Sequence, residues 1–255
     1  MVTLSRDDGV AWIVIDRPEA RNALSFAMWD RLGDIAAGLR RDSTLRAAVI
    51  AGGPQAFAAG ADIAEFRAFA GAADGRAYEA RVESVLQALE DLEVPTIAAL
   101  AGACTGGGVF LAAACDLRLA APNLRAGVPI ARTLGNITTL ANVRRLAALI
   151  GPARVKEWVL TAKLLDANQA LAAGFVTEVV ATDDALEPRA RALAAQLAGF
   201  APRTLRGAKE LYRRVLRGAE ALDDRDILDA CYASADFREG VAAFFEKRRA
   251  EWRDA

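Results

Sequence analysis

The sequence predicts an α/β domain followed by a helical C-terminal region. Three observations support this fold class: short continuously apolar runs, longer segments with helical spacing between them, and only helical patterns from about Asp184 onward. At 255 residues, 54% of them hydrophobic, the chain is long enough for one large core and a smaller appended region.

The predicted strands are apolar throughout rather than alternating between polar and apolar residues. This pattern suits strands covered on both faces, as in a parallel sheet. The runs are residues 10–15, 47–51, 96–101, 117–120 and 175–180.

The first predicted helices lie between these runs. Ser25 can cap a helix that reaches about Leu39, with its apolar residues on one side. Apolar residues at helical spacing predict a second helix over 76–92. The intervening stretch 68–75 is rich in alanine and glycine, so we expect a mobile loop there.

Later helices carry terminal signals of their own. Asp166 with Gln169 resembles a capping box that opens a short helix ending at Gly174. Pro202 suits the first position of a helix that reaches about Arg217. The arginines and lysine of that helix either contact phosphates or form a solvated face.

The composition excludes several classes of site. The chain has no histidine, which rules out Ser-His-Asp and Cys-His catalysis and HExxH zinc sites, and no metal site is expected. The net charge of −1 gives no reason to expect nucleic acid or an anionic membrane as a partner. Three cysteines without a CxxC pair, and no visible signal peptide, favour a cytoplasmic protein with reduced thiols.

Two segments have the form strand, glycine turn, helix: residues 57–63 and 102–108. Glycine lets the backbone approach a ligand closely, and a helix N-terminus offers unpaired N–H groups. Two such turns facing each other would aim two donors at one oxygen, as a thioester enolate requires. Spacing alone leaves the alternative of tight structural turns, and neither segment fits a phosphate loop.

Four segments in order resemble the enoyl-CoA hydratase (crotonase) family over nearly the whole chain. Residues 16–25 (DRPEARNALS) resemble its RPxxxNALS element, and residues 56–63 (AFAAGADI) its AFxAGADI element. Residues 95–116 resemble PxIAAVxGxxxGGGxxLxxxCD, and residues 237–252 (FREGVAAFFEKRRAEW) the closing EGxxAFxEKRxPxW helix. The resemblance implies a ββα spiral core, assigned to residues 1–195, and a helical trimerisation region, assigned to residues 196–255.

The resemblance also implies roles at the two glycine turns. The backbone N–H groups of Ala61 and Gly107 match the oxyanion hole that holds the thioester carbonyl. Ala59 and Ile63 match positions that border the adenine of coenzyme A. Coenzyme A would enter as part of the substrate, and no permanently bound cofactor is expected.

Three further positions match coenzyme A contacts. Arg21 matches a basic residue near the phosphates, while Phe244 and Lys247 match tail positions that meet coenzyme A, often across a subunit interface. For Arg21 and Lys247 the alternative is a solvated surface charge. The family's habit implies a homotrimer or a dimer of trimers.

The two glutamates that hydratases of this family use are replaced here. The first position, aligned from the glycine turn, is Phe110, and the second is Ile130. A positioned acid or base contributes roughly 10²–10⁴-fold to a rate, so efficient hydration is not expected unless another group has moved in.

Several polar residues are candidates for that group. Arg132 can bind a carboxylate with two parallel hydrogen bonds, and Asn136 can orient water. Glu65, Glu79 and Glu83 are candidates for a relocated base, with a solvated helix face as the alternative.

Three functions therefore stay open. One is a lyase or isomerase that acts on an acyl-CoA thioester, with a non-standard base. Another is a catalytically silent acyl-CoA binding protein, and the third is an assembly subunit whose oligomer is the functional product.

Overall fold

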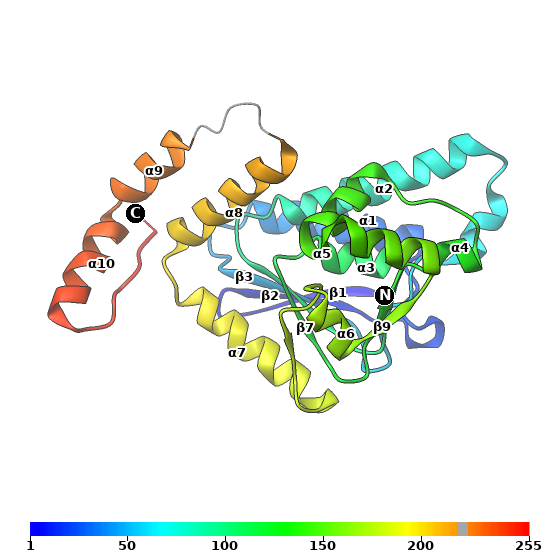
Figure 1. Ribbon diagram of the computed structural model, residues 1–255. Helices are drawn as coiled ribbons and strands as arrows, with labels where there is room; N and C mark the ends of the chain where they lie inside the picture. The colour runs from blue at the N-terminus through cyan, green and yellow to red at the C-terminus, as the bar shows by residue number, and fades with distance from the viewer. Residues whose placement is uncertain (219–223, 255) are drawn as a thin grey trace.

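A computed structural model describes residues 1–218 and 224–254 of the chain (Figure 1). Its larger sheet has six strands in the order β1-β2-β3-β5-β7-β10. From β2 to β10 all neighbours run parallel, and only the edge strand β1 is antiparallel to β2. The strands are β1 (Val2–Asp7), β2 (Val10–Ile15), β3 (Ala47–Ala51), β5 (Thr96–Leu100), β7 (Leu117–Ala120) and β10 (Glu178–Val179). The predicted parallel sheet is thus confirmed.

A second sheet of four very short strands has the order β4-β6-β8-β9. The strands are β4 (Ala56–Ala58), β6 (Ala103–Thr105), β8 (Arg125–Gly127) and β9 (Leu164–Asp166). β4, β6 and β8 run parallel, and β9 is antiparallel to β8. Both glycine turns follow strands of this sheet, which the sequence did not predict.

Helices cover both faces of the larger sheet. One hydrophobic cluster joins the sheet to α1 (Phe26–Arg40), α2 (Ala72–Glu90), α3 (Gly107–Ala113) and α5 (Leu140–Thr161). A smaller cluster joins the opposite face to α7 (Leu186–Ala198), which contacts β2, β3, β5 and β7. In Figure 1, α7 accordingly lies across the sheet from α1, α2 and α5.

The described part of the C-terminal region contains three helices: α8 (Pro202–Arg217), α9 (Arg225–Tyr232) and α10 (Ala235–Glu246). Figure 1 shows α9 and α10 beyond α8, away from the sheet. The predicted α/β core followed by a helical region is confirmed. The predicted division at residues 195 and 196 falls inside α7.

Terminal signals in the sequence identify three helices correctly, one of them α8, which begins at Pro202 and ends at Arg217 as predicted. The Ser25 hydroxyl accepts a hydrogen bond from the Met28 N–H at 3.3 Å, which caps α1. Asp166 and Gln169 form the predicted capping box at α6 (Ala167–Ala172), with bonds of 2.8 and 3.1 Å. Satisfying these otherwise unpaired N–H groups fixes where each helix begins.

The expected mobile loop over residues 68–75 is wrong in its second half. A 3₁₀ helix, η2 (Ile63–Ala68), follows the first glycine turn, and α2 already begins at Ala72. The Asp74 carboxylate accepts hydrogen bonds from the N–H groups of Ala70 and Gly71 at 2.7 and 3.0 Å. This cap allows a helix to start in a segment of small residues.

The basic residues of α8 from Arg203 to Arg214 are paired within the chain rather than simply solvated. Lys209 contacts Asp116 at 2.7 Å, and Arg206 contacts Asp254 at 2.7 Å. The Lys209 side chain is only 9% exposed, so this pair ties α8 to the core. The sequence predicted either phosphate contacts or a solvated face for these residues, and neither prediction includes these ion pairs.

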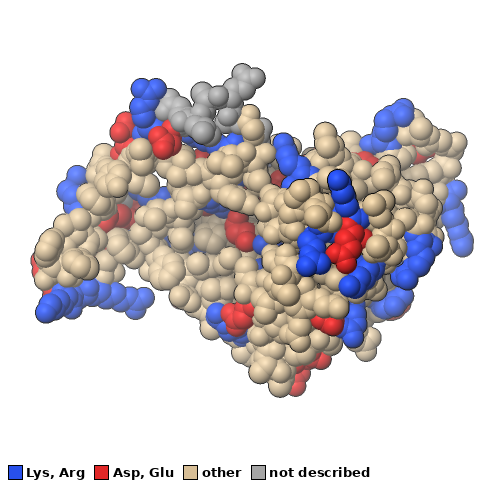
Figure 2. Space-filling model, viewed as in Figure 1, with Lys and Arg blue, Asp and Glu red and all other residues tan. Residues whose placement is uncertain are grey.

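Charged side chains of both signs are interspersed over the face in Figure 2. Basic side chains are most prominent at the end that carries α4 (Ile130–Thr133) and the N-terminus of α2. Exposed arginines there include Arg67, Arg76 and Arg132. Within the described residues, no helix is long and apolar enough to cross a membrane.

Candidate active site

The second glycine turn passes from β6 into α3 through Gly106, whose φ of 52° lies in the left-handed region that glycine tolerates. Gly108, in the first turn of α3, packs directly on β4. A Cβ at Gly108 would fall 2.2 Å from the Ala58 carbonyl oxygen, so only glycine allows this approach. The absence of a side chain at Gly108 therefore allows the two segments to pack closely together.

The first glycine turn is held by the backbone of Leu24. The Leu24 N–H donates to the Gly60 carbonyl at 2.7 Å, and the Asp62 N–H donates to the Leu24 carbonyl at 2.9 Å. These two bonds use the Gly60 carbonyl and the Asp62 N–H, the backbone groups on either side of Ala61. Asp62 then caps η2 by accepting from the Ala64 N–H at 3.1 Å.

The structure brings Ala61 and Gly107 together, as predicted. A Cβ at Gly107 would lie 3.9 Å from the Ala61 nitrogen. In the part of the chain that the structure describes, no hydrogen bond uses the N–H of either residue. Two adjacent, unused backbone donors are what a carbonyl oxygen that gains negative charge requires.

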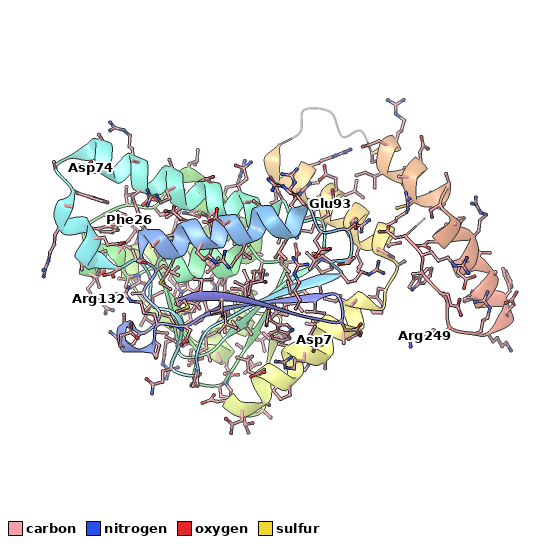
Figure 3. All side chains as sticks on the ribbon, turned by 180° about the vertical axis from the view of Figure 1, so that it is seen from behind. Asp7, Phe26, Asp74, Glu93, Arg132 and Arg249 are labelled. Carbon is pink, nitrogen blue, oxygen red and sulfur yellow. The ribbon has the colours of Figure 1, made fainter. Side chains whose placement is uncertain are left out.

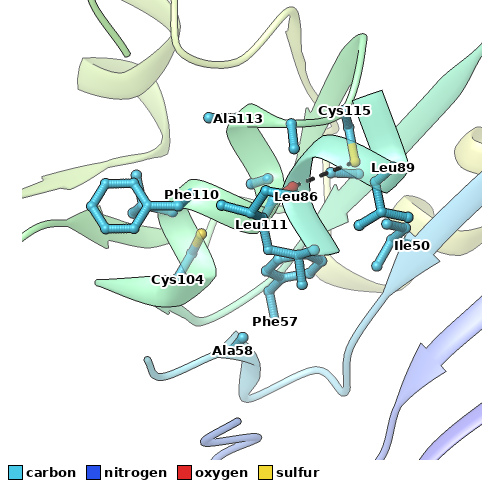
Figure 4. Packing of buried hydrophobic residues seen from close by; sticks show 14 of the residues in the cluster. Ile50, Phe57, Ala58, Leu86, Leu89, Cys104, Phe110, Leu111, Ala113 and Cys115 are labelled. Carbon is cyan, nitrogen blue, oxygen red and sulfur yellow. Dashed lines mark hydrogen bonds between the residues drawn. The ribbon is translucent and has the colours of Figure 1, made fainter. Parts of the chain in front are cut away.

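The apolar ring of Trp29 packs beside the second turn. The Cζ2 atom of Trp29 in α1 lies 3.2 Å from the position of a Cβ on Gly107. Phe110 and Ile130 are 7% and 8% exposed and belong to the same hydrophobic cluster as Trp29. Figure 4 shows the Phe110 ring on one side of this cluster, away from Ile50 and Leu89. Neither Phe110 nor Ile130 therefore offers a proton-transferring group.

Two of the three candidate carboxylates have structural partners. Glu65 Oε2 accepts a hydrogen bond from the Phe26 N–H at 2.7 Å, at the start of α1. Glu83 contacts the buried Arg145 of α5 at 3.0 Å, and Glu90 binds the same guanidinium. The side chain of Arg145 is only 6% exposed, so this network joins α2 to α5.

Glu79 is the candidate carboxylate without a partner among the described residues. It lies one turn before Glu83 on the face of α2 that is directed toward α5. Its side chain is half-buried, and burial, followed by the negative charge of Glu83, raises the pKa of its carboxyl group. A raised pKa brings a carboxylate closer to the range of an effective base at neutral pH.

Arg132 and Asn136 are exposed, and no described residue pairs with either side chain. Figure 3 shows Arg132 at the same end of the molecule as Phe26 and Asp74. Arg132 therefore lies at the end that carries the N-termini of α1 and α2.

The predicted coenzyme A contacts near the first turn also lie together. The Ala59 N–H donates to the Arg21 carbonyl at 3.1 Å, so these two predicted residues are adjacent. Ile63, two residues after Ala61, is 51% exposed and offers an apolar surface at the mouth of the turn. Arg17 pairs with Asp62 at 2.7 Å, and this hydrogen bond lowers the pKa of the Asp62 carboxyl group.

The predicted tail contacts lie elsewhere in the same chain. Phe244 is 79% exposed, and Lys247, which follows α10, is also exposed. In Figure 3 the tail, marked by Arg249, lies at the opposite end from Phe26 and Arg132. The structure thus does not bring these tail residues to the glycine turns of their own chain.

The larger cavities are separate from the paired N–H groups. One of about 370 Å³ lies between α3, α5 and α8, one of about 500 Å³ lies between α8 and α9, and one of about 570 Å³ lies between α8, α9 and α10. None of the three is lined by Ala61 or Gly107. Because carbonyl binding depends on donor geometry, we place the candidate active site at the paired turns rather than at the larger cavities.

Two polar side chains beside the site were not identified as such from the sequence. Trp29 was assigned only to the apolar side of its helix, although its indole carries a donor. Tyr78 lies four residues before Val82, on the apolar face predicted for α2, and that spacing is the signal that could have located it. Among the described residues, no cluster of His, Cys, Asp or Glu could hold a metal ion.

The chain is similar to known proteins over nearly its whole length. The family model described as enoyl-CoA hydratase/isomerase matches residues 5–255. A probable enoyl-CoA hydratase of Mycobacterium bovis is 35% identical over 250 residues, which cover 97% of this chain and 95% of that protein. A crotonyl-CoA hydratase of Syntrophomonas wolfei is 32% identical over 258 residues, covering 98% and 97%. The crystal structure of an enoyl-CoA hydratase/carnithine racemase from Magnetospirillum magneticum superimposes with a TM-score of 0.93 at 32% identity, covering 100% of this chain and 96% of that one.

Proposed function

The chain belongs to the enoyl-CoA hydratase/isomerase family, and on that premise we propose that it is an acyl-CoA thioester enzyme with an unusual proton-transfer group. The Ala61 and Gly107 N–H groups would hold the thioester oxygen. The observation that carries this proposal is their adjacency, with neither N–H used within the described chain. Losing one such donor costs about 2.7–4 kcal/mol of transition-state stabilisation in known cases.

The proposed base is Glu79. Its carboxylate takes a proton from a carbon of the acyl chain that is acidified by the thioester. The electron pair of the broken C–H bond delocalises through the acyl group to the thioester oxygen. The two N–H groups stabilise the negative charge on that oxygen. Return of the proton to a different carbon moves the double bond. If the protonated Glu79 first exchanges its proton with solvent, return to the same carbon leaves a solvent proton there.

This chemistry favours an isomerase or lyase over an efficient hydratase. Adding water across a double bond requires a positioned and activated water molecule, and the two positions that normally carry the glutamates are Phe110 and Ile130. Both are buried apolar side chains. We therefore expect hydration to be slow compared with proton exchange.

Binding of the coenzyme A portion is proposed at the surface beside the first turn. Arg21 and Ala59 are adjacent there, and Ile63 is exposed. Exposed arginines near the N-terminus of α2, and Arg132 on α4, suit the phosphates of coenzyme A. Coenzyme A enters with the substrate in this proposal, and no other cofactor is required.

The tail is proposed to serve a neighbouring copy of the chain in a trimer or a dimer of trimers. Phe244 and Phe245 are 79% and 78% exposed, and Tyr232 is 64% exposed, which is unusual for large apolar side chains. Because the tail and the glycine turns lie at opposite ends of one chain, Phe244 and Lys247 would reach coenzyme A bound to another copy.

The buried apolar residues at Phe110 and Ile130 favour one alternative, a silent acyl-CoA binding protein. Incubation in D₂O with crotonyl, longer enoyl, aryl-enoyl and malonyl-type CoA esters, followed by mass spectrometry, separates the two. Deuterium uptake or product with any ester supports the enzyme. Binding of esters without exchange or product across the panel supports the silent binder, and no binding at all would leave the assembly subunit.

A further inference from the structure

The cavity of about 370 Å³ between α3, α5 and α8 takes no part in the proposed chemistry. Its volume lies within the range of roughly 300–1,000 Å³ that is usual for small-molecule sites. Leucines from several elements line it, and each of them is only partly buried: Leu117, Leu149, Leu197, Leu205 and Leu216. The cavity therefore offers apolar surface that a ligand of moderate size could cover.

One face of α8 forms a wall of this cavity. Leu205, Lys209, Tyr212 and Leu216 all line it, at spacings of four, three and four residues, which place them on one side of a helix. Across the cavity, Ala141 and Arg144 of α5 lie three residues apart and share a face in the same way.

The charged groups of the lining are held by partners within the chain, with one exception. The pairs are Arg145 with Glu90 at 2.5 Å, Lys209 with Asp116 at 2.7 Å, and Arg213 with Asp91 at 3.4 Å. Arg144 is the exception: its side chain is exposed, and no described residue forms an ion pair or a hydrogen bond with its guanidinium group. Its donors are therefore available to a ligand.

The cavity has a polar mouth and an apolar floor. Arg144 and Tyr212, which is 49% exposed, lie at the mouth, and no described residue forms a hydrogen bond with the Tyr212 hydroxyl group. Ala113 and Ala114, which are 7% and 4% exposed, form the floor at the end of α3. Asp116 follows these alanines in the chain, so an anionic group is repelled at the floor and attracted at the mouth.

We propose that this cavity binds an alkyl monocarboxylate of medium chain length. The alkyl chain lies among the leucines, and the carboxylate lies at the mouth, where the planar guanidinium of Arg144 can bind both of its oxygens. The Tyr212 hydroxyl is placed to donate to the same carboxylate. A free acid is required, because a neutral thioester has no charge for Arg144 to bind.

This site is separate from the paired glycine turns. The cavity meets α3 at Ala113, whereas the proposed oxyanion donor Gly107 is at the other end of that helix, about 9 Å away along its axis. Binding here is therefore independent of the proposed function.

The test titrates the full-length protein with octanoate, octanol and octylamine by calorimetry. A single octanoate should bind per chain, roughly 5- to 10-fold more tightly than octanol, because only the acid forms a charge-assisted hydrogen bond with Arg144. Octylamine should bind most weakly, since its ammonium group is repelled. From hexanoate to octanoate, each buried methylene should tighten binding by roughly 3- to 4-fold.

Two variants separate the mouth from the interior. Arg144→Ala should weaken octanoate roughly 5- to 10-fold and leave octanol unchanged. Arg154→Ala is its control, because Arg154 is an exposed arginine of the same helix that pairs with Glu157 and does not line the cavity. Ala141→Phe places a ring in the cavity and should weaken octanoate and octanol alike.

Saturating crotonyl-CoA should leave the octanoate affinity unchanged. Displacement of octanoate by crotonyl-CoA would place octanoate at the glycine turns and overturn the inference. Absence of octanoate binding to the wild type, or equal affinity of Arg144→Ala and the wild type, would also overturn it. None of these results bears on the roles proposed for Ala61 and Gly107.

Discussion

Glu65 Oε2 accepts a hydrogen bond from the Phe26 backbone N–H at 2.7 Å, and this bond joins η2 to the first turn of α1. Ser25 caps the same helix end through Met28. One of the candidate bases is therefore occupied with a helix terminus, where a carboxylate also interacts favourably with the helix dipole. Among the three candidates, this leaves Glu79 as the carboxylate free to accept a proton.

Replacing Glu79 by glutamine should reduce deuterium exchange and turnover by roughly 10²–10⁴-fold, because the amide cannot act as a base. The measurement is the initial rate of exchange in D₂O at saturating ester. Glu65→Gln is the matched control, since its amide oxygen can still accept from Phe26 and the rate should be close to wild type. If the exchange rate fell further in Glu65→Gln than in Glu79→Gln, the base would be Glu65 and not Glu79.

The same Glu79→Gln variant should be more stable than the wild type at neutral pH. The pKa of Glu79 is raised in the folded state, so both states are protonated below its unfolded pKa of about 4.3 and ionisation carries no penalty there. As pH rises through the folded pKa, the ionised, half-buried carboxylate destabilises the wild type. Urea denaturation at several pH values should show that the stability advantage of Glu79→Gln grows as the pH rises from the unfolded to the folded pKa of Glu79. Above the folded pKa the advantage should stay constant.

Gly107→Pro removes one oxyanion donor at the first residue of α3, a helix position that proline tolerates. Gly107→Ala is the control, because it adds the same Cβ against Trp29 but keeps the N–H. We expect kcat of the proline variant to be about 10²–10³-fold below that of the alanine variant. Equal rates in the two variants would remove Gly107 from the oxyanion hole.

Lys247→Ala and Phe244→Ala should raise KM for CoA esters several-fold with little change in kcat, because both residues are expected to meet coenzyme A and not the reacting carbons. The structure adds a sharper test. Mixing Gly107→Pro subunits with subunits lacking these tail residues should restore some sites to a normal KM if the tail serves a neighbouring copy. If mixed oligomers contain no sites with a normal KM, the tail does not serve a neighbouring copy.

Arg145→Ala should destabilise the protein by about 3–5 kcal/mol, because it leaves Glu83 and Glu90 without their shared cation at a site that is largely buried. The neighbouring Arg144→Ala is the control: Arg144 is exposed and has no described ion-pair partner, so its loss should stay within about 0.5 kcal/mol. Urea denaturation of both variants provides the comparison.

Sequence reasoning succeeded where the signal was local or periodic. The apolar runs of β2, β3, β5 and β7 predicted a parallel sheet, and that is what forms. The smaller sheet was missed because strands of three residues, such as β4 and β6, are too short for any periodic pattern. The glycine content of residues 68–75 was misleading because Asp74 caps a helix there.

At the site, the sequence predicted the positions of the two glycine turns. It did not predict which of the surrounding side chains have hydrogen-bond or ion-pair partners. Glycine positions are readable because only glycine permits the approach of Gly108 to Ala58. Which carboxylate is free depends on partners distant in sequence, such as Arg145 for Glu83 and the Phe26 N–H for Glu65. Those pairings arise only once the helices pack.

A carbonyl-binding site made of main-chain atoms is encoded by turns and not by any reactive side chain. With the role proposed for Ala61 and Gly107, the side chains around them can be exchanged in evolution while polarisation of a thioester persists. Replacement of an acid or base then weakens an activity without erasing it, which leaves room for another residue to take over. At a site of this kind we expect a change of acid and base groups to alter the reaction before it ends catalysis.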